Sequence, residues 1–369
     1  MHLLEYFQEL SPQSTFFRDR KLQLPEDISF ALTGARGTGK TALTLSYLRE
    51  LPKEFWLYID CQDPIFALED IDSDTLEKFI QAEQIETLVL DHYYEGFLEY
   101  LPRCFQLILV SREALPTTDL PTYTLYPLDY EEFLSFERSS SPSSSFNRFL
   151  KAGTLPLVTE VSLLALSQQM RSFFYASFSE DESRLMLILA RYQGHHITTH
   201  QLYNYAKEYF RISKDWVYRT IHRFTQEGLI LFVEDAEGKG ARKMILYDFA
   251  LSKYLSKSQP FPITFDAMVV LALFKHAIPF RALGIHGYLV HENELLVPSA
   301  FENEESFWQK AYNKIHLYQK HHIHKITIVT VSNQYSFTLN EILFEAMPFY
   351  EWSILNEAPE EENKNMQIA

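Results

Sequence analysis

Eight residues near the start of the chain have the types and spacing that phosphate binding requires. They read Gly34-Ala35-Arg36-Gly37-Thr38-Gly39-Lys40-Thr41, which fits the phosphate-loop pattern G-x-x-x-x-G-K-[ST]. Glycines let the backbone curl until its N–H groups point at phosphate oxygens. Lys40 would reach the β- and γ-phosphates, and the Thr41 hydroxyl would be a ligand of Mg²⁺. We therefore expect residues 34–42, ending at Ala42, to bind a nucleotide.

The segments on either side of this loop are the ones that must position it. Residues 28–33 are mostly apolar and predict a buried strand, and residues 42–48 carry apolar side chains at helical spacing. The helix that follows the loop would add the partial positive charge of its N-terminus. We expect ATP rather than GTP, because the chain lacks the Asn-Lys-x-Asp pattern that reads guanine.

A later apolar strand, residues 87–91, ends in an acid. Asp91 is our candidate for holding Mg²⁺ beside Thr41, and the alternative is a strand-end acid that caps the next helix. His92 follows, where hydrolytic members of this class often carry a glutamate that polarises the attacking water. An imidazole can accept a proton, but its reach differs from that of glutamate. The sequence therefore predicts nucleotide binding with slow hydrolysis.

Another apolar strand, residues 105–110, is followed by Ser111 and Arg112. Ser111 has the position to sense the γ-phosphate or to orient water, and Arg112 could supply positive charge to the transition state. An ordinary surface role is the alternative for Arg112. Residues 126–136 then read YPLDYEEFLSF, in which Asp129 and Glu132 have the spacing of a helix capping box.

The order of these motifs resembles a group of prokaryotic AAA+-like ATPases related to the STAND and archaeal-type ATPases. The segment 149–156, a leucine helix that ends in Gly153 and then Pro156, also resembles the lid motif of that group. The resemblance extends to about residue 350. It implies an ATPase core followed by a helical lid, a winged helix and a domain of restriction-nuclease fold. Relatives often act as rings or dimers, so a homo-oligomer or a protein partner is implied as well.

Residues 180–257 predict a winged helix on their own pattern. Three helices are expected, the third from Ser213 to Gly228, followed by a hairpin of residues 229–233 and 243–247. Net charge over this stretch is +2 against −18 for the rest of the chain. Duplex DNA is therefore one candidate partner, and a structural connector is the alternative. The candidate DNA-binding residues are Lys214, Arg219, Arg223, Lys239, Arg242 and Lys243.

Residues 259–356 predict a helix, a hairpin, a long helix and a strand at 325–331, which suits a nuclease-like fold. Nucleases of this kind hold Mg²⁺ with an aspartate on one hairpin strand and a Glu-x-Lys on the next. The corresponding places are near Gly287 and Leu296, and neither acid is present. We therefore expect the fold without nuclease activity.

The composition of the chain indicates a folded, acidic protein. With 369 residues, 46% of them hydrophobic, and a net charge of −16, the chain should form packed domains and is not a general nucleic-acid coat. Cys61 and Cys104 are expected to be reduced core thiols. We find no signal peptide and no apolar run long enough for a bilayer, so a cytoplasmic protein without membrane contact is expected.

Together these features predict an α/β phosphate-loop NTPase with additional domains. We expect an ATPase core over 1–138, a serine-rich linker and helical lid over 139–179, and a winged helix over 180–258. A nuclease-like domain over 259–356 and a disordered acidic tail over 357–369 complete the chain. The expected function is a nucleotide-dependent switch, with an ATP-gated protein scaffold or a pseudo-ATPase as alternatives.

Overall fold

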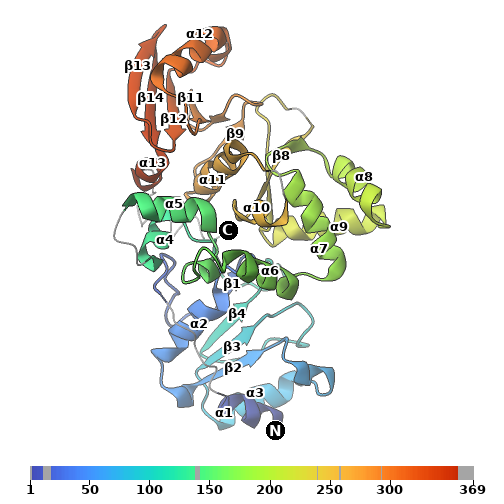
Figure 1. The fold of residues 1–369 in the computed structure, drawn as a ribbon. Helices are drawn as coiled ribbons and strands as arrows, with labels where there is room; N and C mark the ends of the chain where they lie inside the picture. The colour runs from blue at the N-terminus through green and yellow to red at the C-terminus, as the bar shows by residue number, and fades with distance from the viewer. Residues whose placement is uncertain are drawn as a thin grey trace. The chain divides into compact units, whose positions relative to one another are not determined.

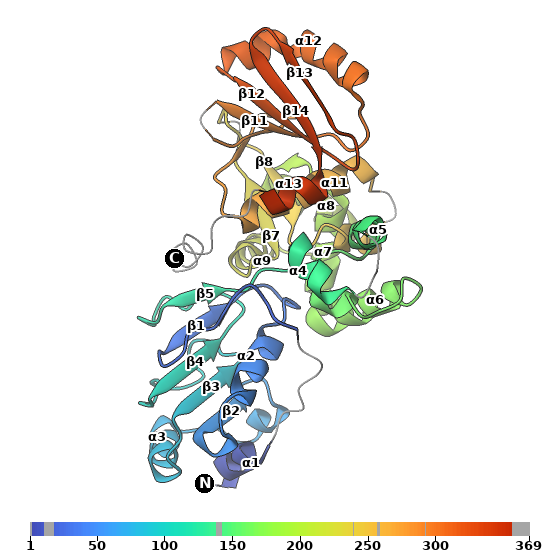
Figure 2. The same cartoon turned by 90° about the vertical axis from the view of Figure 1, so that its left-hand side faces the viewer.

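A computed structural model describes residues 2–10, 18–137, 142–238, 240–256, 259–291 and 293–355 (Figures 1 and 2). The chain forms two compact units. The first comprises the described residues up to Pro127 together with Gln226–Gly228, and the second comprises Leu128–Thr225 and the described residues from Leu229 onward. The expected tail over 357–369 lies outside the described residues. In the part of the chain that the structure describes, no helix has the length and apolarity to cross a bilayer.

A parallel sheet forms the centre of the first unit. Its strands follow the order β2-β3-β4-β1-β5, and every neighbouring pair is parallel. Strands β1, β3 and β4 are buried along their whole length, which explains why their sequences are continuously apolar rather than alternating. The strands are β1 (Phe30–Thr33), β2 (Trp56–Asp60), β3 (Thr87–Asp91), β4 (Gln106–Val110) and β5 (Thr122–Thr124).

Helices cover both faces of this sheet. Helix α2 (Lys40–Arg49) packs with Trp56, Tyr58 and Val89 on one face. Helices α1 (His2–Glu9) and α3 (Ser73–Ala82) pack on the other face, with short 3-10 turns at Lys53–Phe55 and Pro64–Ala67 in the connections. The crossovers of a parallel sheet need such helices, so this arrangement follows from the alternation of apolar strands and amphipathic helices. The predicted order of strand, loop and helix around residue 34 is confirmed.

The second unit begins with helices α4 (Tyr130–Phe136), α5 (Pro142–Ala152) and α6 (Leu166–Ser177), with a 3-10 turn at Pro156–Val158. The predicted capping box is present, because Asp129 accepts from the Glu132 N–H and Glu132 accepts from the Asp129 N–H. The sequence predicted a serine-rich linker at the start of 139–179, but α5 already begins at Pro142 and includes part of the serine-rich stretch. Proline is common in the first turn of a helix, because the N–H groups of that turn have no hydrogen-bond partner within the helix.

Three further helices and a small antiparallel sheet follow. Strands β6, β8 and β7 lie side by side in that order, and β7 and β8 form the expected hairpin. Ser179 and Thr198 cap the first two helices through capping boxes. The two-residue strand β6 was not predicted. The elements are α7 (Glu180–Arg191), β6 (His196–Ile197), α8 (Thr199–Tyr209), α9 (Lys214–Gln226), β7 (Ile230–Val233) and β8 (Arg242–Leu246).

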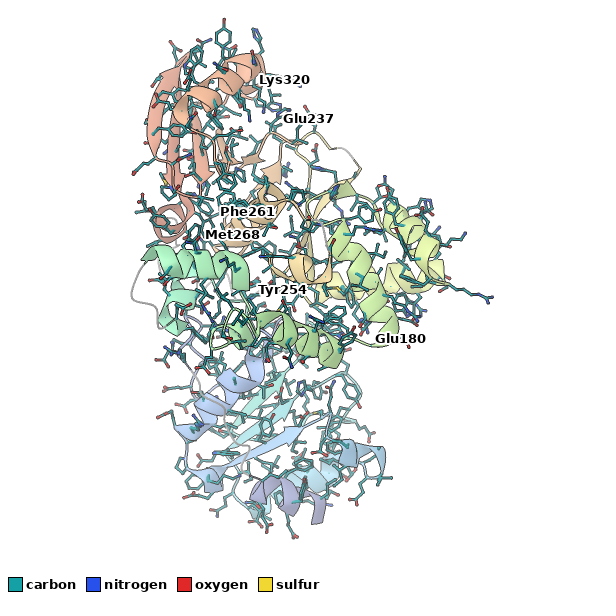
Figure 3. The ribbon with its side chains drawn as sticks, viewed as in Figure 1. Glu180, Glu237, Tyr254, Phe261, Met268 and Lys320 are labelled. Carbon is teal, nitrogen blue, oxygen red and sulfur yellow. The ribbon has the colours of Figure 1, made fainter. Side chains whose placement is uncertain are left out.

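A mixed six-stranded sheet ends the second unit, in the order β13-β14-β12-β11-β10-β9. Strands β11, β12 and β14 are parallel neighbours, and α12 packs its buried side chains on one face. Figure 3 labels Lys320 of α12 and Glu237 before β8, which lie 3.4 Å apart as an ion pair. The elements are α10 (Leu251–Leu255), α11 (Phe261–Lys275), β9 (Arg281–Ala282), β10 (Tyr288–Leu289), β11 (Glu294–Pro298), α12 (Glu304–Lys320), β12 (Lys325–Thr330), β13 (Tyr335–Leu339), β14 (Ile342–Pro348) and α13 (Phe349–Leu355).

This sheet differs from the sequence prediction in two ways. The hairpin expected between the two helices has first strands of only two residues each, β9 and β10, because Gly284 and Gly287 between them both take positive φ angles and turn the chain. The sequence prediction also ended at the strand over 325–331. It missed β13, β14 and α13, although Tyr335, Phe337 and Leu339 alternate with polar residues as a half-buried strand should.

Candidate functional site

The phosphate loop lies where β1 passes into α2. Gly34, Gly37 and Gly39 all have positive φ angles, of 139°, 79° and 95°, so the curled backbone needs glycine at each of them. Gly39 caps α2, which starts at Lys40 and includes Ala42 in its first turn. Strand β1 has β4 on one side and β5 on the other. Ligands of open parallel sheets bind at such a switch point, outside the carboxyl ends of the strands.

Lys40 is turned back onto the loop. Its Nζ donates to the carbonyl oxygens of Gly34 and Ala35, at 2.7 and 3.0 Å. Burial lowers the pKa of Lys40 to about 8, while the charge of Asp91 acts in the opposite direction. Two neutral carbonyl oxygens compensate poorly for the hydration that a partly buried ammonium group loses, so a phosphate group would be a better partner for Lys40.

Asp91 meets Thr41 as the sequence predicted. The Thr41 hydroxyl donates to Asp91 Oδ2 at 2.7 Å, and the carboxylate is fully buried. Tyr58 on β2 donates to the same oxygen at 2.7 Å, and the N–H of His92 donates to Oδ1 at 2.8 Å. Burial, with the adjacent Asp91 charge, raises the pKa of Tyr58. A hydroxyl and a carboxylate side by side are the hard oxygen ligands that Mg²⁺ prefers, so these residues fit the metal.

His92 is fixed by a residue that the sequence analysis did not select. Its Nδ1 lies 2.8 Å from Oδ1 of Asp60, at the end of the neighbouring strand β2. This hydrogen bond raises the pKa of His92, although partial burial acts to lower it. Asp60 ends an apolar strand just as Asp91 does, so the same sequence rule would have found it. Tyr58 left no such signal, because its role depends on how β2 and β3 align.

Ser111 and Arg112 lie at the carboxyl end of β4, next to the loop strand β1. Ser111 is buried, and its N–H donates to the carbonyl of Leu32 in β1 at 2.9 Å. Arg112 donates to the side chain of Gln62 at 3.3 Å, and its charge contributes to the lowered pKa of Lys40. The structure therefore brings both residues to the same edge of the sheet as the loop. Their proposed catalytic roles stay predictions.

Two buried arginines support the loop. Arg20 donates to the carbonyls of Thr38 and Tyr126, at 2.8 and 2.7 Å. Arg36 donates through Nε and Nη2 to the two carboxylate oxygens of Glu227, at 3.0 and 3.1 Å. Glu227 belongs to the same unit as the loop. Bidentate, charge-assisted pairs of this kind hold a fixed geometry, so Arg36 acts here as an anchor of the loop backbone.

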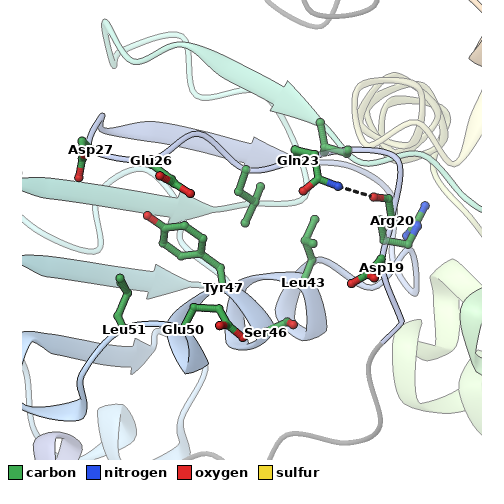
Figure 4. Close-up of a pocket in the computed structure, with 12 residues that line it drawn as sticks. Asp19, Arg20, Gln23, Glu26, Asp27, Leu43, Ser46, Tyr47, Glu50 and Leu51 are labelled. Carbon is green, nitrogen blue, oxygen red and sulfur yellow. Dashed lines mark hydrogen bonds between the residues drawn. The ribbon is translucent and has the colours of Figure 1, made fainter. Parts of the chain in front are cut away.

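A cavity of about 500 Å³ lies beside α2 (Figure 4). It is bordered by residues 19–27 and by one side of the helix, including Leu43 and Tyr47. Four of the residues that line it carry carboxyl groups, against one arginine, so this cavity would repel phosphates. The acidic residues are Asp19, Glu26, Asp27 and Glu50.

In the second unit, the candidate DNA-binding residues differ in exposure and in their acidic partners. Lys214 and Arg219 lie exposed on α9, with Tyr218 between them. Arg223 pairs with Glu182 of α7, and Lys243 pairs with Asp266 of α11 at 2.6 Å. These ion pairs give Arg223 and Lys243 acidic partners on other elements, and their role in DNA binding stays a prediction. Arg242 pairs with Glu234 at 3.3 Å, and Lys239 lies outside the described residues.

Comparison with known proteins finds distant similarity to solved structures. No known family model matches the sequence, and no curated protein matches it. The chain is similar to a Walker-type ATPase of Pyrococcus abyssi at 12% identity and a TM-score of 0.42, over 62% of this chain and 91% of that one. It is also similar to the Orc1 protein of Aeropyrum pernix, solved in complex with DNA, at 12% identity and a TM-score of 0.31, over 62% of this chain and 86% of that one.

Proposed function

We propose that the protein binds ATP with Mg²⁺ at residues 34–42 and acts as a nucleotide-dependent switch. The observation that carries this proposal is the meeting of Lys40, Thr41 and Asp91 at the carboxyl edge of a parallel sheet. Lys40 would exchange its carbonyl partners for phosphate oxygens, which are stronger acceptors for an ammonium group. Thr41 and Asp91 would hold Mg²⁺, whose charge offsets that of the phosphates when it is bound.

Hydrolysis at this site is proposed to be slow. His92 occupies the place of the residue that polarises water, and its hydrogen bond to Asp60 raises its pKa. A raised pKa keeps more of the imidazole protonated near neutral pH, and a protonated imidazole cannot accept a proton from water. Ser111 and Arg112 remain candidates for contact with the γ-phosphate. A slow ATPase suits a switch better than a motor, because each nucleotide state then persists.

For the second unit we propose a helical lid over 139–179, a winged helix over 180–258 and an inactive nuclease-like domain over 259–356. The support for the winged helix is the order α7, α8, α9 and then the β7–β8 hairpin. Lys214, Tyr218 and Arg219 on the exposed side of α9 favour duplex DNA as a partner. The competing proposal is a protein-interaction scaffold, formed by one chain or by a homo-oligomer.

Phosphate release from ATP tests this function. The wild-type protein should show slow, Mg²⁺-dependent turnover, and Asp91→Asn should lower it at least about tenfold by removing the charge that holds the metal. Asp72→Asn is the matched control, because Asp72 only caps α3 at the surface of the same unit. Equal rates for the Asp91→Asn and wild-type proteins would contradict the assignment.

Adding duplex DNA to the same assay separates the two proposals for the second unit. If DNA is the partner, turnover should rise, and the Lys214→Glu, Arg219→Glu double variant should lose the response without losing basal turnover. DNA binding should also weaken steeply with salt. A rate that DNA leaves unchanged would favour the scaffold.

A further inference from the structure

The hydroxyl of Tyr58 contacts Asp91, the candidate metal ligand. Its hydroxyl donates to Asp91 Oδ2 at 2.7 Å, and its ring is buried in the core beneath α2. Strands β2 and β3 pair in parallel register, with Tyr58 opposite Val89 and Asp60 opposite Asp91. Val89 and Asp91 are two residues apart on β3, so their side chains share a face of the sheet. Because Tyr58 lies opposite Val89, its side chain is on the same face as Asp91.

The hydrogen bonds of Asp91 leave its carboxylate little freedom. Oδ2 accepts from Thr41 and Tyr58, and Oδ1 accepts from the N–H of His92. Thr41 would turn its oxygen toward Mg²⁺ when the metal binds, and the backbone N–H reaches only Oδ1. The phenol of Tyr58 would then be the side-chain donor that keeps Oδ2 facing the loop. Partners of this kind orient metal ligands and typically change metal affinity by about 10- to 100-fold when they are removed.

Packing alone does not account for a tyrosine at this position. Phenylalanine has the same ring and would fill the same space among Trp56, Val89 and Leu43. A buried hydroxyl costs free energy unless it is hydrogen-bonded, and the bond recorded for this hydroxyl is to Asp91. The hydroxyl therefore has a function that the ring does not.

We propose that Tyr58 is a positioning residue that holds Asp91 in the orientation needed for Mg²⁺. The inference rests on the proposed binding of ATP and Mg²⁺ at this loop. It gives strand β2, which lies outside the phosphate-loop pattern, a role in metal binding.

The test measures how much Mg²⁺ tightens nucleotide binding, using a fluorescent ATP analogue with Mg²⁺ or with EDTA. Tyr58→Phe should leave affinity in EDTA unchanged and should reduce the Mg²⁺-dependent gain about tenfold. Tyr47→Phe is the matched control, because the Tyr47 hydroxyl donates at 3.0 Å to Gln106 in the same unit, away from Asp91. This control should keep the wild-type gain, and circular dichroism should show both variants folded.

Two results would overturn the inference, and they can be told apart. A Tyr58→Phe protein with the wild-type Mg²⁺ gain would show that the hydroxyl does not position Asp91, while ATP binding itself stands. Loss of affinity in EDTA to the same extent as in Mg²⁺ would make Tyr58 a structural residue of the loop. A wild-type protein that binds no nucleotide would instead remove the proposed function on which the inference rests.

Discussion

Lys40 is a half-buried residue whose ammonium group donates to carbonyl oxygens of its own loop. Neutral carbonyls do not replace the hydration that the charge gives up, which is why burial lowers its pKa to about 8. The negative charge of Asp91 raises the pKa of Lys40, and the positive charge of Arg112 lowers it. A bound phosphate would supply negative charge and raise the pKa again. Nucleotide binding and protonation of Lys40 should therefore be coupled.

This coupling predicts a pH dependence at the residue scale. Only the protonated lysine pairs with phosphate, so ATP affinity should fall about tenfold between pH 7 and pH 9, as Lys40 loses its proton in the free protein. The phosphates titrate near pH 6 and stay charged over this range. Fluorescence titrations at the two pH values measure the effect. Affinity that stays flat in the wild-type protein would show that Lys40 is charged throughout.

At the scale of elements, the loop depends on a close approach to the chain after β5. The N–H of Leu125 donates to Thr33, and a Cβ atom added to Gly34 would lie 2.3 Å from the carbonyl oxygen of Leu125. Gly34 also has a φ of 139°. The first glycine of the loop is thus required by packing of β5 against the end of β1, in addition to any contact with phosphate.

Gly34→Ala should therefore lower the melting temperature more than Gly96→Ala. Gly96 also has a positive φ, of 90°, and nothing within 4 Å of an added Cβ, so alanine there meets the strain of a positive φ without the collision. We expect the collision to cost about 1–3 kcal/mol beyond the shared strain. Thermal unfolding followed by circular dichroism compares the two variants. Equal melting temperatures would mean that the loop shifts freely away from Leu125.

Elements whose signals are local in the chain could be predicted from the sequence. The strand, loop and helix around residue 34 follow from glycine spacing and apolar runs, and the capping box at Asp129 follows from residue types three apart. The meeting of Thr41 with Asp91 was predicted as well, because a phosphate loop and an acid at a strand end share one edge of a parallel sheet.

Contacts between distant segments could not be predicted. The bond from Tyr58 to Asp91 depends on the register of β2 against β3, which the sequence does not state. The ion pair of Lys243 with Asp266 joins two elements that the sequence placed in separate domains. Strands β13 and β14 were missed, although apolar and polar residues alternate in β13, because the pairing of β13 with β14 and of β14 with β12 joins segments whose alignment the sequence does not state.

At the scale of the whole molecule, the proposed nucleotide site and the proposed partner-binding helix belong to different units. The first unit carries the residues proposed to bind ATP and Mg²⁺, and the second carries helix α9 with exposed Lys214 and Arg219. A switch needs nucleotide binding before anything else, since a ligand can shift an equilibrium only through the contacts that it makes. Binding of ATP through Lys40 is therefore the central claim.

Isothermal titration of ATP with Mg²⁺ into the purified protein tests that claim most directly. The wild-type protein should bind at a single site, and Lys40→Ala should weaken binding at least about tenfold, the usual effect of losing a charged hydrogen bond. Lys53→Ala serves as the control, because Lys53 stacks over the ring of Trp56 in the same unit. No heat of binding in the wild-type protein, or equal affinity in the Lys40→Ala variant, would contradict the account.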